Sequence, residues 1–111
     1  MQNITHVKDL EIGTVSGGEK SKDVKEIFSS GRRQMIEITL RDNAVLSKHK
    51  AGEPISVLCL GGNGRFLAGR DLEETQILQP GTLVTLEANI EHEVIAEPEL
   101  HILLTKFKQS D

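Results

Sequence analysis

The chain has 111 residues, which is enough for one domain built around one hydrophobic core. Its 37% hydrophobic and 27% charged residues are typical of a folded globular protein and argue against a disordered chain. The net charge of -4, with three Phe and no Trp or Tyr, argues against a nucleic-acid partner, which needs a clustered basic face or stacking aromatic side chains.

Nothing in the sequence indicates a membrane protein. No stretch approaches the roughly 20 apolar residues of a membrane-spanning helix, and the N-terminal residues show no basic segment followed by an apolar one. We therefore expect a cytoplasmic protein without a membrane partner. The single cysteine, Cys59, lies inside the apolar run 55–60, which predicts a buried and unreactive thiol.

The first 33 residues carry no regular pattern, and residues 21–28 fit either a short helix or an irregular strand. From Gln34 onward, apolar or alternating runs separated by turn residues predict about eight strands. We expect them at residues 34–41, 45–49, 55–60, 65–68, 75–78, 82–86, 92–96 and 100–107. The sequences GGNG at 61–64 and EPE at 97–99 are predicted turns.

These short strands predict an all-β protein. Antiparallel strands must hide their edges, and a jelly-roll barrel of two sheets does so in a chain of this length. We assign residues 33–107 to the barrel and 108–111 to a frayed tail. Residues 1–32 form an N-terminal segment that is added to the barrel or to a dimer interface.

Residues 79–92 resemble the second of the two cupin motifs, written G-x5-P-x-G-x2-H-x3-N. Gly81 and His92 stand at its glycine and histidine, while Glu87, Asn89 and Ala96 replace its proline, second glycine and asparagine. The chain is therefore similar to small single-domain cupins over about residues 33–107. The resemblance implies the cupin form of jelly roll, a double-stranded β-helix.

The first cupin motif, G-x5-H-x-H-x3/4-E-x6-G, is kept only in part. His49 matches its second histidine, whereas Ser47 replaces the first histidine and Arg41 the opening glycine. Glu53 fits the shorter spacing from His49, but counting back from the closing glycine at position 61 reaches a proline instead. The acidic position of the motif is thus ambiguous in this chain.

The resemblance implies a site at His49 and His92. In cupins with both full motifs, three histidines and one glutamate hold a divalent ion, and this chain supplies His49 and His92, with Glu53 or His101 as further candidates. Ser47 belongs to the same pocket, because the period of a strand puts residues 47 and 49 on one face. The two imidazoles either bind backbone or water, hold a weakly bound transition metal, or contact an organic ligand directly.

We favour a cupin of unassigned activity whose barrel pocket binds a small molecule at His49 and His92. The alternative is a metal-dependent enzyme, an oxygenase or isomerase, acting on a small organic substrate. The sequence leaves open whether the protein is catalytic and what its ligand is. Because similar small cupins pair, and because residues 1–32 could add a strand to a neighbour, we also expect a homodimer.

Other polar groups carry no site. His6 is expected at the surface without a partner, and the acidic residues at 71, 73 and 74 lack the alternating ligands of a calcium loop. The adjacent Arg32 and Arg33 begin a predicted strand, where they are either exposed or meet an acidic ligand or partner.

Overall fold

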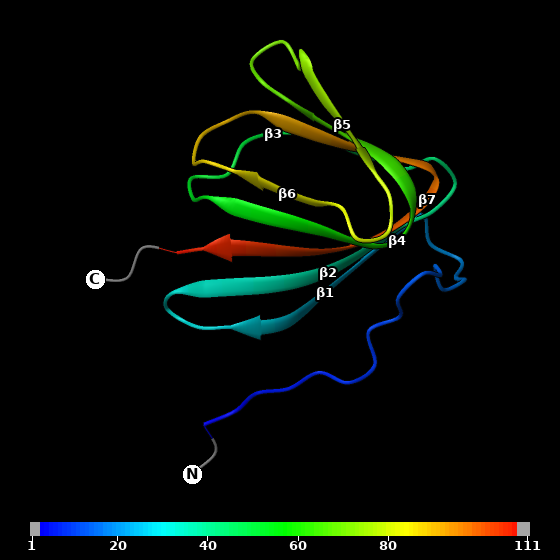
Figure 1. Cartoon of the computed structure of the whole chain (residues 1–111), viewed down its shortest axis with the longest axis vertical. Helices are drawn as coiled ribbons and strands as arrows, with labels where there is room; N and C mark the ends of the chain where they lie inside the picture. The colour runs from blue at the N-terminus through cyan, green and yellow to red at the C-terminus, as the bar shows by residue number, and fades with distance from the viewer. Residues whose placement is uncertain (1–2, 109–111) are drawn as a thin grey trace.

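The computed structural model describes residues 3–108 and contains seven strands and no helix in that range. Figure 1 shows the strands wrapped into a β-barrel, with the N-terminal segment running outside them. The strands are β1 (Lys22–Ser29), β2 (Arg33–Leu40), β3 (Val45–His49), β4 (Ile55–Ala68), β5 (Glu74–Leu78), β6 (Leu83–Leu86) and β7 (His92–Phe107).

Two long strands, β4 and β7, build both layers of the barrel, and Figure 1 shows β4 curving from one layer into the other. The C-terminal half of β7 pairs with β2 and with the start of β4, which also pairs with β6, while β1 extends the layer beyond β2. The N-terminal half of β7 lies between β3 and the end of β4, which pairs with β5. The predicted all-β jelly roll is confirmed.

The turns predicted at 61–64 and 97–99 do not interrupt the strands. Instead, β4 and β7 run through them side by side, with irregular register on both sides of Gly62. Gly62 has φ +78°, and a Cβ there would lie 2.1 Å from the carbonyl oxygen of Glu99. Glycine thus serves close backbone approach rather than a turn. The structure therefore has six strands after residue 32, not eight.

Residues 21–28 are not helical. Most of them belong to β1, which pairs antiparallel with β2 from Lys22 opposite Leu40 to Ser29 opposite Gln34. The local sequence allowed both conformations, and pairing with the free edge of β2 satisfies the backbone of the strand. At the other end of the chain, Lys108 donates its backbone N–H to the carbonyl of Arg32, and residues 109–111 of the predicted tail lie outside the described range.

The core lies between the two layers. Cys59 is buried in it as predicted, and burial raises the pKa of its thiol above the usual value. The other buried apolar side chains of this cluster are Ile38, Leu40, Ile55, Val57, Phe66, Ala68, Leu78, Val94, Ala96, Leu100 and Ile102. Within residues 3–108, no helix is long and apolar enough to cross a membrane.

Arg41, directly after β2, anchors the N-terminal segment to the outer face of the barrel. It is only 6% exposed, and its guanidinium donates to the carbonyl of Ser16 over 2.8 Å and to that of Lys20 over 2.9 Å. It also forms an ion pair with Asp23 of β1. The residue that replaces the motif glycine therefore holds a structural element that the motif does not include.

Candidate functional site

His49 and His92 are brought together by strand pairing. His49 ends β3 and His92 begins β7, and the register places them directly opposite each other. Their ring centroids are 4.3 Å apart with an interplanar angle of 60°. Phe66 of β4 stacks on the other side of His92, with 5.6 Å between centroids and an angle of 8°. The predicted pair is therefore one packed unit.

The two imidazoles differ in environment but share one backbone interaction. His92 is 4% exposed, whereas His49 is exposed. The Nδ1 atom of His49 lies 2.6 Å from the carbonyl oxygen of Ser47, and that of His92 lies 3.0 Å from the carbonyl oxygen of Ile90. Because a carbonyl can only accept, each Nδ1 carries the proton, and in the neutral ring Nε2 is left as an acceptor.

Burial lowers the pKa of His92 below its usual value, and the neighbouring charges of His49 and Lys106 lower it further. The hydrogen bond to the carbonyl of Ile90 acts in the opposite direction and is outweighed. His92 is therefore a neutral imidazole at neutral pH. A neutral ring can accept a hydrogen bond from a ligand, which an imidazolium cannot.

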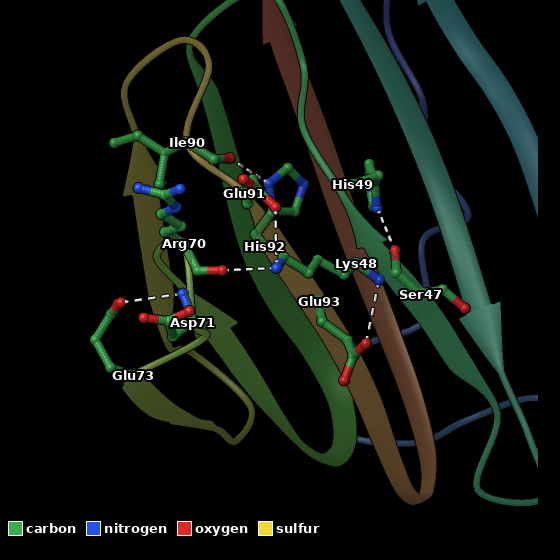
Figure 2. A network of polar contacts seen from close by, with 10 residues as sticks. All are labelled: Ser47, Lys48, His49, Arg70, Asp71, Glu73, Ile90, Glu91, His92 and Glu93. Carbon is green, nitrogen blue, oxygen red and sulfur yellow. Dashed lines mark hydrogen bonds and ion pairs between the residues drawn. The ribbon is translucent and has the colours of Figure 1, made fainter.

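Lys48 fixes the strand end that carries His49. Its Nζ donates to the carbonyl oxygen of Arg70 over 2.6 Å and lies 3.1 Å from the Glu91 carboxylate. Its backbone N–H donates to the carboxylate of Glu93. Figure 2 shows these contacts linking β3 to the loop after β4 and to the start of β7. Lys48 was not predicted from the sequence, although it stands beside His49 and two glutamates flank His92.

The barrel interior holds only a small cavity next to this pair. Its volume is about 30 Å³, room for about two water molecules at roughly 10–15 Å³ each. Apolar side chains from both layers form most of its wall. The lining residues are Ile38, Leu46, His49, Ile55, Val57, Phe66, His92, Val94, Ile102 and Leu104. Since His49 is exposed, it marks the end of the cavity that opens toward solvent.

Ser47 does not share a face with His49. A bulge in β3 pairs Leu46 with Val94 and His49 with His92, so the two residues between them in β3 lie opposite one residue of β7. Leu46 and His49 therefore both line the cavity, while Ser47 is exposed and contributes its backbone carbonyl to His49. The expectation from strand periodicity was wrong here, because a bulge resets the alternation.

The two further metal candidates lie elsewhere. Glu53 is half-buried in the loop between β3 and β4 and is not part of the cavity wall. His101 lies on the outer face of β7, where its Nε2 is 2.6 Å from the Glu37 carboxylate. In residues 3–108, no three His, Cys, Asp or Glu side chains come together as a metal site. Two imidazoles alone do not fit a resident zinc ion, which takes three or four protein ligands.

Comparison with known proteins identifies the fold. No protein-family model and no curated protein matches the chain in sequence. Solved structures do match, among them a cupin superfamily protein from Desulfitobacterium hafniense, with a TM-score of 0.77 and 15% identity over 86% of this chain and 84% of that one. A conserved protein of unknown function from Streptococcus pyogenes matches with a TM-score of 0.77 and 18% identity over 99% and 95%.

A cupin 2 conserved barrel domain protein from Leptotrichia buccalis has a TM-score of 0.75 and 25% identity over 85% of this chain, which spans 44% of that protein. The protein therefore has the cupin fold, as its two motifs predicted. Many small cupin superfamily proteins match it over most of its length. The fold accommodates many functions, so the site must carry any argument about activity.

Proposed function

We propose that the protein binds a small organic molecule at the open end of the barrel, with His49 and His92 as hydrogen-bonding groups and without a resident metal ion. The observation that carries this proposal is the packed His49–His92 pair, in which both Nδ1 atoms are engaged by backbone carbonyls. When such a ring is neutral, its other nitrogen, Nε2, is an acceptor. The pair is thus suited to a ligand that donates hydrogen bonds.

A small hydroxy acid is the ligand class that best fits these groups. Its hydroxyl would donate to an imidazole Nε2, and its carboxylate would be attracted by Lys106, whose charge acts on His92. The interior cavity of about 30 Å³ excludes a ligand buried deep in the barrel. The ligand therefore binds at the mouth beside the exposed ring of His49.

Ligand-observed NMR with glycolate, lactate and glycerate tests this proposal. We expect at least one of the three to bind wild-type protein, and His49→Gln to weaken that binding about tenfold, because a charged or well-placed hydrogen bond contributes on the order of 1–2 kcal/mol. His6→Gln is the matched control, since His6 is exposed and lies in the N-terminal segment. Absence of binding, or binding unchanged by His49→Gln, would contradict the proposal.

The metal-dependent enzyme remains the alternative, and one measurement separates it from the binding protein. Imidazoles that donate through Nδ1 to carbonyls resemble metal-ligating histidines, which are commonly oriented in this way. The missing third ligand argues against it. Stoichiometric metal in protein purified without chelator, lost in His92→Ala, would favour the oxygenase or isomerase.

We further propose that the protein is a cytoplasmic homodimer. Cys59 as a free buried thiol is compatible with a reducing compartment. Apolar side chains on the edge strand β1 and on the N-terminal segment, such as Val24 and Ile12, are exposed in the single chain and offer a surface for a second copy. Sedimentation should show a dimer at micromolar concentration and a monomer for Val24→Asp; a wild-type monomer would refute the dimer.

A further inference from the structure

A second cavity lies outside the barrel, between the N-terminal segment and the outer face of β1, β2 and β7. Its volume is about 480 Å³, within the range of roughly 300–1,000 Å³ that is typical of ligand pockets. The sheet provides an apolar floor made by Ile27, Phe28, Met35 and Leu103. Asn3, Ile4, Thr5, Val7 and Leu10 form the roof, and Arg33 completes the wall.

This cavity is separate from the histidine site. Leu103 lines the outer cavity, while its neighbours Ile102 and Leu104 line the inner one, because successive residues of β7 point to opposite faces. The sheet therefore stands between the two. A ligand in the outer cavity would not contact His49 or His92.

The roof is held loosely. Residues 3–12 belong to no strand, and the backbone hydrogen bonds described for the segment begin at Gly13, whose N–H bonds to the carbonyl of Leu60. Ile4 lines the cavity but is 76% exposed. Figure 1 shows this part of the chain as an irregular trace apart from the strands. Backbone and guanidinium hydrogen bonds therefore hold the segment at Gly13 and through Arg41, and not along residues 3–12.

Arg33 gives the cavity one positive charge. Its guanidinium carbon lies 4.6 Å above the centre of the Phe28 ring, so the side chain is directed over the apolar floor. Among residues 3–108, no carboxylate lies within ion-pair distance of it. The cavity thus combines an apolar surface with a cation that is available to an anion.

We propose that this cavity binds an anionic amphipath, a medium-length alkyl carboxylate whose chain packs on Met35 and Leu103 and whose carboxylate pairs with Arg33. Transfer of the alkyl chain from water into the cavity favours binding, since burial of apolar surface is favourable. Arginine matches a carboxylate in geometry and charge. The loose roof admits the ligand and closes over it.

Methyl NMR on methionine tests this directly. The chain has only two methionines, Met1 and Met35, so ¹³C-methyl labelling gives one signal from the cavity floor and one from outside the described range. Decanoate, added below its micelle concentration, should shift the Met35 signal saturably. Decylamine, with the same chain and the opposite charge, should shift it far less at equal concentration.

Two neighbouring arginines provide the matched variants. Arg33→Gln should weaken decanoate binding about twofold to fivefold, as expected for an exposed ion pair, whereas Arg32→Gln should leave it unchanged because Arg32 is not part of the wall. Folding of both is checked by circular dichroism. An unmoved Met35 signal, as when a second copy covers the face, would overturn the proposal, and so would equal binding by both variants.

Discussion

The inner face of the barrel, to which both layers contribute, is packed differently from the outer face of the layer formed by β1, β2, β7, β4 and β6. The inner face is tightly packed, with a cavity of about 30 Å³ next to two histidines, and its polar groups are bonded to the chain itself. The outer face is covered by a segment without strand structure, which leaves a cavity of about 480 Å³ between itself and the sheet. The side with the family motif residues therefore offers less space for a ligand than the outer face does.

The polar groups of the two faces also differ. On the outer face, the buried Arg41 donates four hydrogen bonds, to carbonyls of the N-terminal segment and to Asp23. His101 pairs with Glu37 through Nε2, and its buried Nδ1 has no hydrogen-bond partner within the described residues. On the inner face both histidines have carbonyl partners. The contacts of Arg41 on the outer face thus hold a separate segment in place, whereas those on the inner face orient a site.

The largest effect should come from the inner face. Phe66 is 2% exposed and stacks on His92, so Phe66→Ala should lower the free energy of unfolding by about 3–5 kcal/mol through lost burial and a cavity. Phe107→Ala is the matched control, because Phe107 is exposed and should cost less than about 1 kcal/mol. Urea unfolding measures both; equal losses would show that the inner face is not the better packed one.

Arg41→Ala tests the outer face and should lower the free energy of unfolding by about 2–3 kcal/mol, since the buried guanidinium and its charged hydrogen bonds to the segment are lost. It should also release the segment, so that limited proteolysis cuts within residues 3–21 faster than in wild type. Arg32→Ala, at an exposed position, should change the free energy of unfolding by less than about 0.5 kcal/mol and should leave the rate of proteolysis unchanged. An uncut segment in Arg41→Ala would mean that apolar packing alone holds it.

The lowered pKa of His92 makes the inner face pH-sensitive. His92 binds a proton more readily in the unfolded chain, where its pKa is near 6.5, than in the folded chain. The contribution of neutral His92 to the free energy of unfolding is therefore complete above about pH 6.5 and is lost as the pH falls below it. Urea unfolding at pH 7.5 and at pH 5 should therefore show a loss in wild type that is smaller in His92→Gln. The groups that act on His92 are His49 and Lys106, and a loss of equal size in His92→Gln would assign the effect to other groups.

The smallest effect concerns metal. Wild-type protein purified without added metal should carry well under one ion per chain. Ser47→His restores the histidine of the first motif. Because of the bulge in β3, the new side chain would point away from His49, so zinc affinity should change by less than about twofold. Elemental analysis and zinc titration check both statements. A strong gain in affinity would show that β3 rearranges around a metal.

Much of this arrangement was accessible from the sequence. The alternation in residues 34–41 and the turns after them predicted the strands, since burial of one face imposes a period of two. The apolar run around Cys59 predicted a buried thiol, and the spacing of Gly81 and His92 predicted the cupin fold. Local pattern determined these features because each depends on the residues of one strand or one motif.

Tertiary structure decided the rest. The sequence around Gly62 predicted a turn, whereas in the structure a Cβ at Gly62 would lie 2.1 Å from the carbonyl oxygen of Glu99 in β7. Residues 22–29 form a strand by pairing with β2. The bulge that turns Ser47 away from His49, and the contacts that make Arg41 an anchor, depend on a partner strand or segment far away in the chain. A sequence pattern reports which side chains can share a face, but pairing between distant segments determines which of them meet.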